Sequence, residues 1–489
     1  MRPSVLLRAS IVSLALSACF AFNVNAKQAR EVGEPEAATG YNEKRAFEAK
    51  EYMVVAANPY ASWAGKNILE KGGSAIDAAV AVQAMLSLVE PQSSGIGGGA
   101  FILYWDNKNK VLHTFDGRET APASVNAHWF MQGNKPMRWI DAVVGGKSVG
   151  VPGAVKALEM AQSEFGKLPW NTLFDDTIKT AEQGFTVSPR LAKLVALDYH
   201  PGLKNFTSSS VYFFPAGQPL QEGVNKKNKK LAKTLRGIAE QGSDYLLKGE
   251  VAKKIVEAVN TAEINPGSLT LEDLANYEPI KRDPVCGTYH DKRICGMPPP
   301  SSGGVNVFQI LKMLEEFNLS QYEPNSVEFA HLYTQASARS YADREKNIAD
   351  SDFTNLPFAA MINKAYLERR AQEIGIDKSW RRARAGNPYA DANVALGSSM
   401  ELPNTSHVSI VDKEGNAISM TTSIEFMFGS GIMVEGFLLN NQLTDFSFTP
   451  TANRFPVPNR VEPGKRPRSA MSPTMVFDKN GNLELVVGS

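Results

Sequence analysis

A threonine within residues 404–412 has the surroundings of a nucleophile. Thr405 follows a polar run and begins a short alternation of apolar and polar residues, which predicts a β-strand. A threonine hydroxyl becomes nucleophilic when a base lies beside it, and the nearest base is the α-amino group of the same residue. That group exists only after the bond between Asn404 and Thr405 is cut. The stretch therefore suggests an inactive precursor that forms its active site by cleaving itself.

A β-hairpin is predicted directly after this threonine. Two alternating runs flank residues 413–416, a four-residue turn that contains a glycine, and this pattern indicates a hairpin. If Asp412 lies opposite Ala417, the register brings Ser423 and Glu425 to the neighbourhood of the threonine. A slip of one residue would change which side chains face it. The alternative interpretation is an ordinary edge hairpin rich in Thr and Ser.

Further blocks of sequence support the precursor hypothesis. They are Glu90-Pro91-Gln92-Ser93-Ser94-Gly95-Ile96-Gly97-Gly98-Gly99, Met297-Pro298-Pro299-Pro300-Ser301-Ser302-Gly303-Gly304, Tyr341-Ala342-Asp343-Arg344, Thr405-Ser406-His407, Val411-Asp412-Lys413-Glu414-Gly415-Asn416, Phe428-Gly429-Ser430-Gly431, Leu439-Asn440-Asn441-Gln442, Asp445-Phe446-Ser447 and Lys465-Arg466-Pro467. Together, and in this order, they resemble the γ-glutamyltranspeptidase family. The resemblance extends from about residue 51 to residue 489.

The resemblance implies an α+β fold of the N-terminal-nucleophile hydrolase type. This fold is a four-layer αββα sandwich, in which two stacked β-sheets lie between helical layers. The resemblance also implies autoproteolysis between Asn404 and Thr405. The expected products are a large subunit, residues 27–404, and a small subunit, residues 405–489, which stay packed together.

The same resemblance implies roles for individual residues. Thr405 matches the nucleophile, with its own α-amine as the base, and Ser423 matches a hydroxyl that hydrogen-bonds it. Arg118 matches the arginine that binds the substrate carboxylate, a task that suits a guanidinium fork. Without the family match, Arg118 would be interpreted as part of a surface salt bridge to Glu119 or Asp116. The remaining matches are Glu425, Gln442 and Asp445 for the substrate ammonium and Ser469 for its carboxylate.

The implied reaction is acyl transfer through a covalent intermediate. The threonine takes the γ-glutamyl group from glutathione or another γ-glutamyl amide and passes it to water, an amino acid or a peptide. The resemblance implies no cofactor, and no His or Cys cluster has the spacing of metal ligands.

Two departures from the family pattern affect substrate specificity. Ala470 stands where the family has a second serine beside Ser469, and the loss of one hydroxyl donor to a carboxylate costs about 1.5–3 kcal/mol of binding. Residues 448–464 form a shorter lid region than in many bacterial members. The alternative function is therefore a glutaryl-cephalosporin-acylase-like amidase of the same fold, whose substrate lacks the α-amino acid head.

A third departure concerns the C-terminal residues, 487–489. The resemblance implies a following Pro-Gly-Gly segment that supplies the oxyanion hole, and further small-subunit residues. We therefore expect a C-terminally truncated member. The corresponding hypothesis is an uncleaved, inactive fragment that serves only as a binding or structural remnant.

The first residues predict export. A positively charged start, an apolar run at residues 9–22 and small residues at 24–26 are typical of a signal peptide, here residues 1–26. The alternative is a lipoprotein cleavage box that ends at Cys19, which would leave a lipid anchor. Both interpretations place the protein outside the cytoplasm, in a periplasm.

Composition agrees with an exported globular enzyme. The chain has 489 residues, a hydrophobic content of 43% and a net charge of +1, so nothing indicates a nucleic-acid partner. The lysine-rich residues 225–230 predict a solvated face. No run after residue 26 is long and apolar enough to span a bilayer.

Two cysteines are predicted to face each other in a hairpin that turns at His290 and Asp291. Counted outward from this turn, Cys286 and Cys295 occupy a non-hydrogen-bonded pair, where Cα atoms approach to about 4.5 Å. An oxidising compartment would allow a disulfide between them. The alternative is two buried free thiols.

The elements that must position these residues follow from periodicity. Helices are predicted at residues 61–69 and 75–89, the second apolar on nearly all sides and therefore buried, and strands at residues 101–105 and 111–115. Helices should dominate residues 155–274 and 305–371.

Two segments without regular periodicity border the predicted site. The glycine-rich residues 95–99 lack the Lys-Ser/Thr ending of a phosphate-binding loop, so tight backbone packing is the preferred interpretation. Residues 381–404 predict a flexible run up to the cleavage point.

Overall fold

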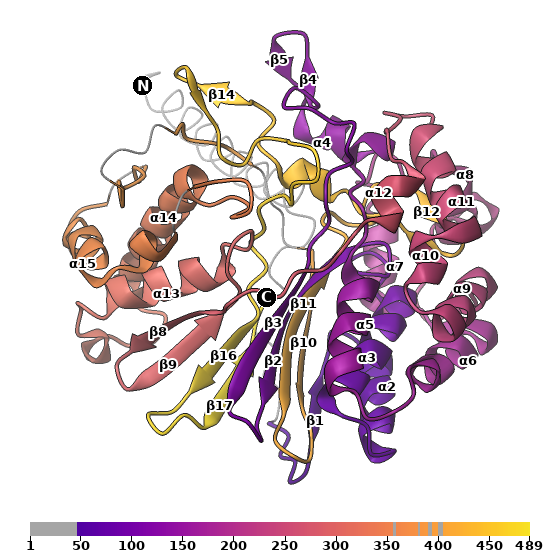
Figure 1. Cartoon of the computed structure of the whole chain (residues 1–489), viewed down its shortest axis with the longest axis horizontal. Coiled ribbons are helices and arrows are strands. Elements are labelled where there is room, and N and C mark those ends of the chain that lie inside the picture. The colour runs from indigo at the N-terminus through magenta and orange to yellow at the C-terminus, as the bar shows by residue number, and fades with distance from the viewer. Residues whose placement is uncertain (1–45, 356–357, 380–381, 390–393, 400–403) are drawn as a thin grey trace, which may run out of the picture. The chain divides into compact units, whose positions relative to one another are not determined.

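Two β-sheets lie between two groups of helices in the computed structural model (Figure 1). The structure describes residues 46–355, 358–379, 382–389, 394–399 and 404–489. Glu48–Ser489 form one compact unit. The expected signal peptide and Cys19 lie outside the described residues.

The first sheet is antiparallel and has the strand order β1-β10-β11-β2-β3. Its strands are β1 (Met53–Val55), β10 (Ser406–Val411), β11 (Ala417–Ser423), β2 (Gly99–Asp106) and β3 (Val111–Gly117). The two strands that follow Thr405 therefore pair between strands from the start of the chain. Strands from before and after the expected cleavage point are therefore joined by ladders of backbone hydrogen bonds, β1 with β10 and β2 with β11.

The second sheet is also antiparallel and has the order β17-β16-β9-β8. Its strands are β17 (Leu483–Val487), β16 (Thr474–Phe477), β9 (Lys292–Gly296) and β8 (Val285–Tyr289). Shorter two-stranded ribbons are β4 (Met131–Gln132) with β5 (Lys135–Pro136), β6 (Phe185–Thr186) with β7 (Asn225–Lys226), β12 (Met433–Val434) with β13 (Phe437–Leu438), and β14 (Thr451–Ala452) with β15 (Phe455–Pro456).

Strand β2 explains why the sheets stack. All eight of its residues are buried. Phe101 and Trp105 join a core with Met475 and Phe477 of the second sheet, whereas Ile102 packs into the larger core on the helical side. Alternate side chains of a strand point to opposite faces, so a strand that is apolar at every position needs a layer on each side.

One helical layer covers the outer face of the first sheet. It contains α2 (Pro59–Glu70), α3 (Ala75–Val89) and α5 (Ala154–Phe165). Helix α3 begins with a capping box between Ser74 and Asp77, and all fifteen of its residues are buried, as predicted. Further helices on this side of the chain are α4 (Trp139–Val143), α6 (Asp175–Gln183), α7 (Pro189–Ala196), α8 (Thr207–Phe213), α9 (Lys229–Gln241), α10 (Asp244–Leu247), α11 (Gly249–Asn260) and α12 (Leu271–Ala275).

The other helical layer covers the second sheet. It contains α13 (Gly303–Leu314), α14 (Val327–Asn347) and α15 (Lys364–Gln372), which lie together beyond β8 and β9 (Figure 1). An apolar cluster that includes Met313 and Leu332 joins α13 to α14. The order helix, sheet, sheet, helix is the predicted αββα sandwich.

The predicted register of the hairpin after Thr405 is wrong by one residue. Val411, not Asp412, pairs with Ala417. The carboxylate of Asp412 accepts hydrogen bonds from the amides of Glu414 and Asn416, and Gly415 has a φ of +80°. Five residues, 412–416, therefore connect the paired strands, with a left-handed glycine among them, and the four-residue turn does not form.

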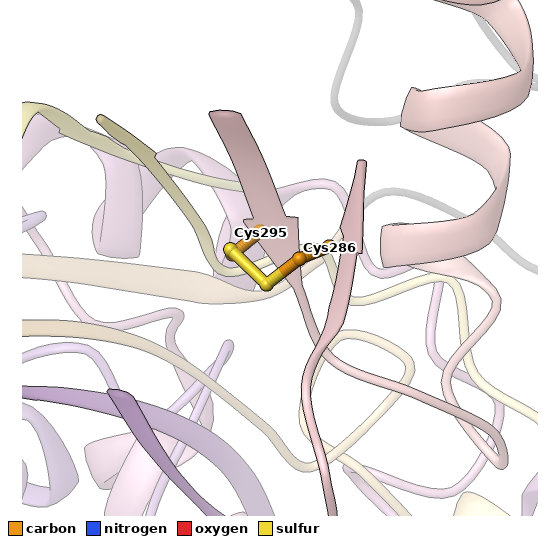
Figure 2. Close-up of a disulfide and its surroundings, with 2 residues drawn as sticks. All are labelled: Cys286 and Cys295. Carbon is orange, nitrogen blue, oxygen red and sulfur yellow. A yellow bond between two sulfur atoms is a disulfide. The ribbon is translucent and has the colours of Figure 1, made fainter. Parts of the chain in front are cut away.

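The hairpin of β8 and β9 has the predicted register. Cys286 lies opposite Cys295, and their Cα atoms are 4.1 Å apart. The structure joins the two sulfur atoms in a disulfide that connects the neighbouring strands (Figure 2). His290 occupies the turn with a φ of +50°.

The glycine-rich segment before β2 is closely packed against backbone, as predicted. A Cβ atom at Gly97 would lie 2.2 Å from the carbonyl oxygen of Leu438, and one at Gly98 would lie 2.1 Å from that of Ser423. Only glycine permits this approach. Among the helices of the described residues, none combines the length and apolar character needed to cross a bilayer.

Candidate active site

A cavity of about 650 Å³ lies where the two sheets meet α13 and α14. Residues far apart in sequence meet there because the end of β11, the loops after it and the loop before β16 all border the cavity. Every residue predicted for catalysis or substrate binding lines this cavity. These residues are Arg118, Asn404, Thr405, Ser423, Glu425, Gln442, Asp445 and Ser469.

The carbonyl group of Asn404 is held in place at the predicted cleavage point. The Ser423 hydroxyl donates a long hydrogen bond of 3.4 Å to the Asn404 carbonyl oxygen, and the backbone amide of Glu425 donates to the Ser423 hydroxyl at 2.8 Å. A donor on this oxygen stabilises the negative charge that forms when a nucleophile attacks the carbonyl carbon. Thr405, the next residue, is partly exposed in the cavity.

The side chain of Asn404 is anchored by the segment between α3 and β2. Its amide nitrogen donates to the Gln92 carbonyl oxygen at 2.6 Å, and the Ser93 hydroxyl donates to its side-chain oxygen at 3.0 Å. The next hydroxyl, that of Ser94, lies 3.0 Å from the hydroxyl of Ser406. Sequence reasoning assigned no role to these residues, although they lie within one of the family-like blocks.

Arg118 is buried beside the cavity and is not part of a surface salt bridge. Only 1% of the residue is exposed. Its guanidinium pairs with Asp445 and also donates to the backbone oxygens of Pro467 at 3.1 Å and Arg468 at 2.9 Å. These contacts fix the plane of the guanidinium, as a carboxylate-binding arginine requires.

Glu425 approaches the cavity from the turn after β11. Its φ is +76°, a strained value for a residue with a Cβ atom. The side-chain amide of Asn441 donates to its carboxylate, and Asn441 also accepts from the amide of Phe426. The strained turn and Asn441 together direct this carboxylate into the cavity. The role of Asn441 was not predicted.

Glu119 is a fully buried carboxyl next to Arg118. Burial raises the pKa of Glu119 to about 8, against the opposing effect of the Arg118 charge. One of its carboxylate oxygens lies 3.7 Å from an Arg118 nitrogen. The carboxyl is therefore predominantly protonated at neutral pH, and the negative charges that line the cavity belong to Glu425 and Asp445.

The loop before β16 forms the remaining polar wall. The backbone of Ser469 is tied to Pro300 and Ser302 by hydrogen bonds of 3.0 and 2.8 Å. Its hydroxyl accepts from the amide of Met471 at 3.1 Å. Ala470 also lines the cavity, so the substitution of the second serine changes the wall of the site. Within the described residues, no group of His, Cys, Asp and Glu is arranged to hold a metal ion.

Comparison with known proteins agrees with this arrangement. The profile of the family described as Gamma-glutamyltranspeptidase matches residues 61–489. Glutathione hydrolase proenzyme of Bacillus subtilis (strain 168) is 40% identical over 450 residues, which cover 90% of this chain and 75% of that protein.

Solved structures share the fold. Cephalosporin acylase from Bacillus halodurans matches with a TM-score of 0.79 and 28% identity, over 93% of this chain and 80% of that chain. The γ-glutamyltranspeptidase from Helicobacter pylori matches with a TM-score of 0.68 and 32% identity, over 71% of this chain and 100% of that chain. The fold is that of the N-terminal-nucleophile hydrolases, a class of enzymes. Within this class, the chain belongs to the gamma-glutamyltranspeptidase family.

The expected C-terminal truncation is not supported. The family match reaches the last residue, Ser489. In the structure, Gly488 and Ser489 line the cavity, and the Ser489 carbonyl oxygen accepts hydrogen bonds from the Ser472 amide at 2.7 Å and the Thr421 hydroxyl at 3.3 Å. The strand β17 thus directs the segment after Val487 towards the site.

Proposed function

We propose that this protein is a γ-glutamyltranspeptidase and glutathione hydrolase that matures by cutting itself between Asn404 and Thr405. The products are a large subunit of residues 27–404 and a small subunit of residues 405–489. Export through a signal peptide at residues 1–26, to a periplasm, completes the proposal. The B. subtilis relative, named a glutathione hydrolase proenzyme, supports both the precursor and the substrate class.

Maturation begins with the hydroxyl of Thr405. Its oxygen attacks the carbonyl carbon of Asn404, the peptide C–N bond breaks, and the nitrogen takes a proton. This step frees the Thr405 α-amine and leaves an ester, and water then hydrolyses the ester to the Asn404 carboxylate and the Thr405 hydroxyl. The Ser423 hydroxyl, hydrogen-bonded to the carbonyl oxygen, stabilises the charge that forms there.

The mature enzyme repeats this chemistry on its substrate. The Thr405 oxygen attacks the γ-amide carbon, while the Thr405 α-amine takes the hydroxyl proton and passes it to the leaving amine. Water or an amino-acid amine then attacks the γ-glutamyl ester and regenerates the threonine. The α-amine is the general base in both half-reactions.

One observation carries the choice of a γ-glutamyl substrate. The cavity that contains Thr405 is lined by one guanidinium, that of Arg118, and by two carboxylates, those of Glu425 and Asp445. An α-amino acid head carries one carboxylate and one ammonium, so this set of charges complements it. A glutaryl group has no ammonium and would place no positive charge beside these two carboxylates.

The first test is cleavage. Wild-type protein should give two bands on a denaturing gel, the smaller beginning at Thr405, and should release amine from γ-glutamyl-p-nitroanilide. Thr405→Ala should give one uncut band and no turnover. Processing that persists in Thr405→Ala would refute the nucleophile, and an uncut wild-type chain would favour the inactive remnant.

The second test separates the transpeptidase from the acylase of the same fold. We expect γ-glutamyl anilide to be cleaved faster than glutaryl anilide at equal concentration. Ala470→Ser should lower KM for the γ-glutamyl substrate by about tenfold, because it restores one hydroxyl donor to a carboxylate. A preference for glutaryl anilide would establish the acylase instead.

A further inference from the structure

A second cavity, of about 730 Å³, is separate from the candidate active site. It is bordered by α8, the start of α9, the end of α11 and the strand β12. Helices α8 and α11 lie beside β12 at one side of the molecule (Figure 1). None of the residues that line this cavity lines the active-site cavity. Residues 226–230 of the lysine-rich stretch border it, although the sequence predicted only a solvated face there.

The charged groups of this cavity are mainly cationic. Four lysines line it, and they are Lys226, Lys227, Lys229 and Lys230. The last three form no ion pair with a described residue. Two carboxylates also line the cavity, those of Glu263 and Glu435, and Glu435 is already paired with Lys254 at 2.7 Å. The cavity therefore has an excess of positive charge, which an anion would complement.

Lys226 is the least exposed of the four lysines. Its ammonium donates to the Tyr212 carbonyl oxygen at 2.7 Å and lies 4.2 Å from the centre of the Tyr212 ring, so its position is fixed. Burial lowers the pKa of Lys226, and no carboxylate of the described residues pairs with it. An anion beside this ammonium would stabilise the charged form.

Apolar side chains line the remaining wall together with three hydroxyl groups. The apolar residues are Phe206, Val211, Ala258, Ala262, Ile432 and Met433, and the hydroxyl groups are those of Thr207, Ser208 and Thr261. The Ser208 hydroxyl already donates to the Met433 carbonyl oxygen at 2.7 Å, which joins α8 to β12. Val211 is 69% exposed. A ligand with an apolar body would remove this surface from water.

We propose that this cavity is a second ligand site and that it binds a small amphipathic anion, with one anionic head and an aromatic or aliphatic body. The lysines bind the head, and the apolar residues cover the body. An inorganic anion would leave the apolar wall exposed, and a neutral apolar molecule would leave the excess positive charge without a partner. The site does not depend on the proposed function, because the two cavities share no residue.

Three probes test the two halves of the ligand separately by isothermal titration calorimetry of the full chain. 2-Naphthoate has both the head and the body, 2-naphthylmethanol has the body alone, and acetate has the head alone. We expect 2-naphthoate to bind about tenfold more tightly than 2-naphthylmethanol, because only the carboxylate meets the lysines. Acetate should show no saturable binding, because it buries almost no apolar surface.

Two changes in the chain locate the binding. Lys229→Gln with Lys230→Gln should weaken 2-naphthoate by about tenfold and leave 2-naphthylmethanol unchanged, because it removes charge alone. Lys179→Gln with Lys193→Gln is the matched control, because it removes the same charge from exposed positions on α6 and α7 outside the cavity. Val211→Ser, at an exposed position, should weaken both naphthyl probes by about threefold through the lost apolar contact.

The outcomes decide the proposal. Binding of 2-naphthoate that is weakened by the change at residues 229 and 230, and is unaffected by the control pair, establishes the site. Absence of saturable binding to wild-type protein refutes it. Equal affinity in all variants, or equal weakening by the cavity pair and the control pair, also refutes it. None of these changes touches the active site, so donor hydrolysis should stay constant, and a wild-type chain without turnover would refute the proposed function alone.

Discussion

Glu119 affects the charge around the Arg118 guanidinium although we assign it no catalytic role. It is adjacent to Arg118 in sequence and in space, yet its environment raises its pKa to about 8. A carboxylate ionised at this position would compete with the substrate for the Arg118 guanidinium. In its protonated form it leaves the guanidinium to Asp445 and to the substrate carboxylate that we propose binds there.

This perturbation predicts a pH dependence of stability. Between the ordinary pKa of 4.5 and about 8, the unfolded chain loses the Glu119 proton and the folded chain keeps it. The contribution of Glu119 to the free energy of unfolding therefore falls by about 5 kcal/mol as the pH rises through this window, and it does not change further above it. Glu119→Gln cannot ionise and should not show this loss.

Urea unfolding of both proteins between pH 5 and 8 measures the difference. The gap between Glu119→Gln and wild type should grow in favour of the variant as the pH rises. The other titrating groups are the same in both proteins, so their contributions cancel. Parallel pH profiles would show that Glu119 does not carry the raised pKa.

At the scale of elements, the glycine-rich segment before β2 positions the site. Gly98 lies against the backbone at the end of β11, where a Cβ atom would be 2.1 Å from the Ser423 carbonyl oxygen. Ser423 in turn donates to the carbonyl oxygen at the cleavage point. The packing of Gly98 therefore affects the position of Ser423 and, through it, of the Asn404 carbonyl group.

Gly98→Ala should therefore slow self-cleavage. The added methyl group displaces the end of β11 by a substantial part of an ångström, and a shift of this size at a reacting group costs about 10²-fold in rate. Gly95→Ala is the control, because a Cβ atom there meets nothing closer than 3.8 Å. The rate at which the fragment beginning at Thr405 forms, followed on gels after cell-free synthesis, gives the comparison. Equal rates for the two variants would refute this coupling.

At the scale of the whole molecule, the two parts of the chain are interleaved. Strands β10 and β11 pair with β1 on one side and β2 on the other, and β16 pairs with β9. Residues on both sides of Thr405 therefore share two sheets and the core between them. The proposed cleavage would remove one covalent bond and leave these contacts in place.

The cleaved protein should behave as one particle under native conditions. On size exclusion, residues 27–404 and 405–489 should elute together, at the volume of uncut Thr405→Ala, and should separate only in denaturant. The paired strands and the shared apolar core supply the affinity. Elution of residues 405–489 as a separate species in native buffer would contradict the interleaved fold.

Much of the local structure could be predicted from the sequence. The pattern of residues 75–89, apolar on nearly all sides, predicted a buried helix, because a helix without a polar face must be covered all round. The pairing of Cys286 with Cys295 followed from counting outward from a turn. The register after Thr405 could not be counted in the same way, since it depends on the side chain of Asp412 and the left-handed conformation of Gly415.

The sequence by itself determined the residue types for acyl transfer, and its family-like blocks implied the family and the four-layer fold, because such motifs are local properties. Only the tertiary structure decided how these residues meet. Burial next to an arginine sets the protonation of Glu119, and packing against Gln92 and Ser93 fixes Asn404. These properties depend on contacts between distant segments, which a linear pattern does not contain.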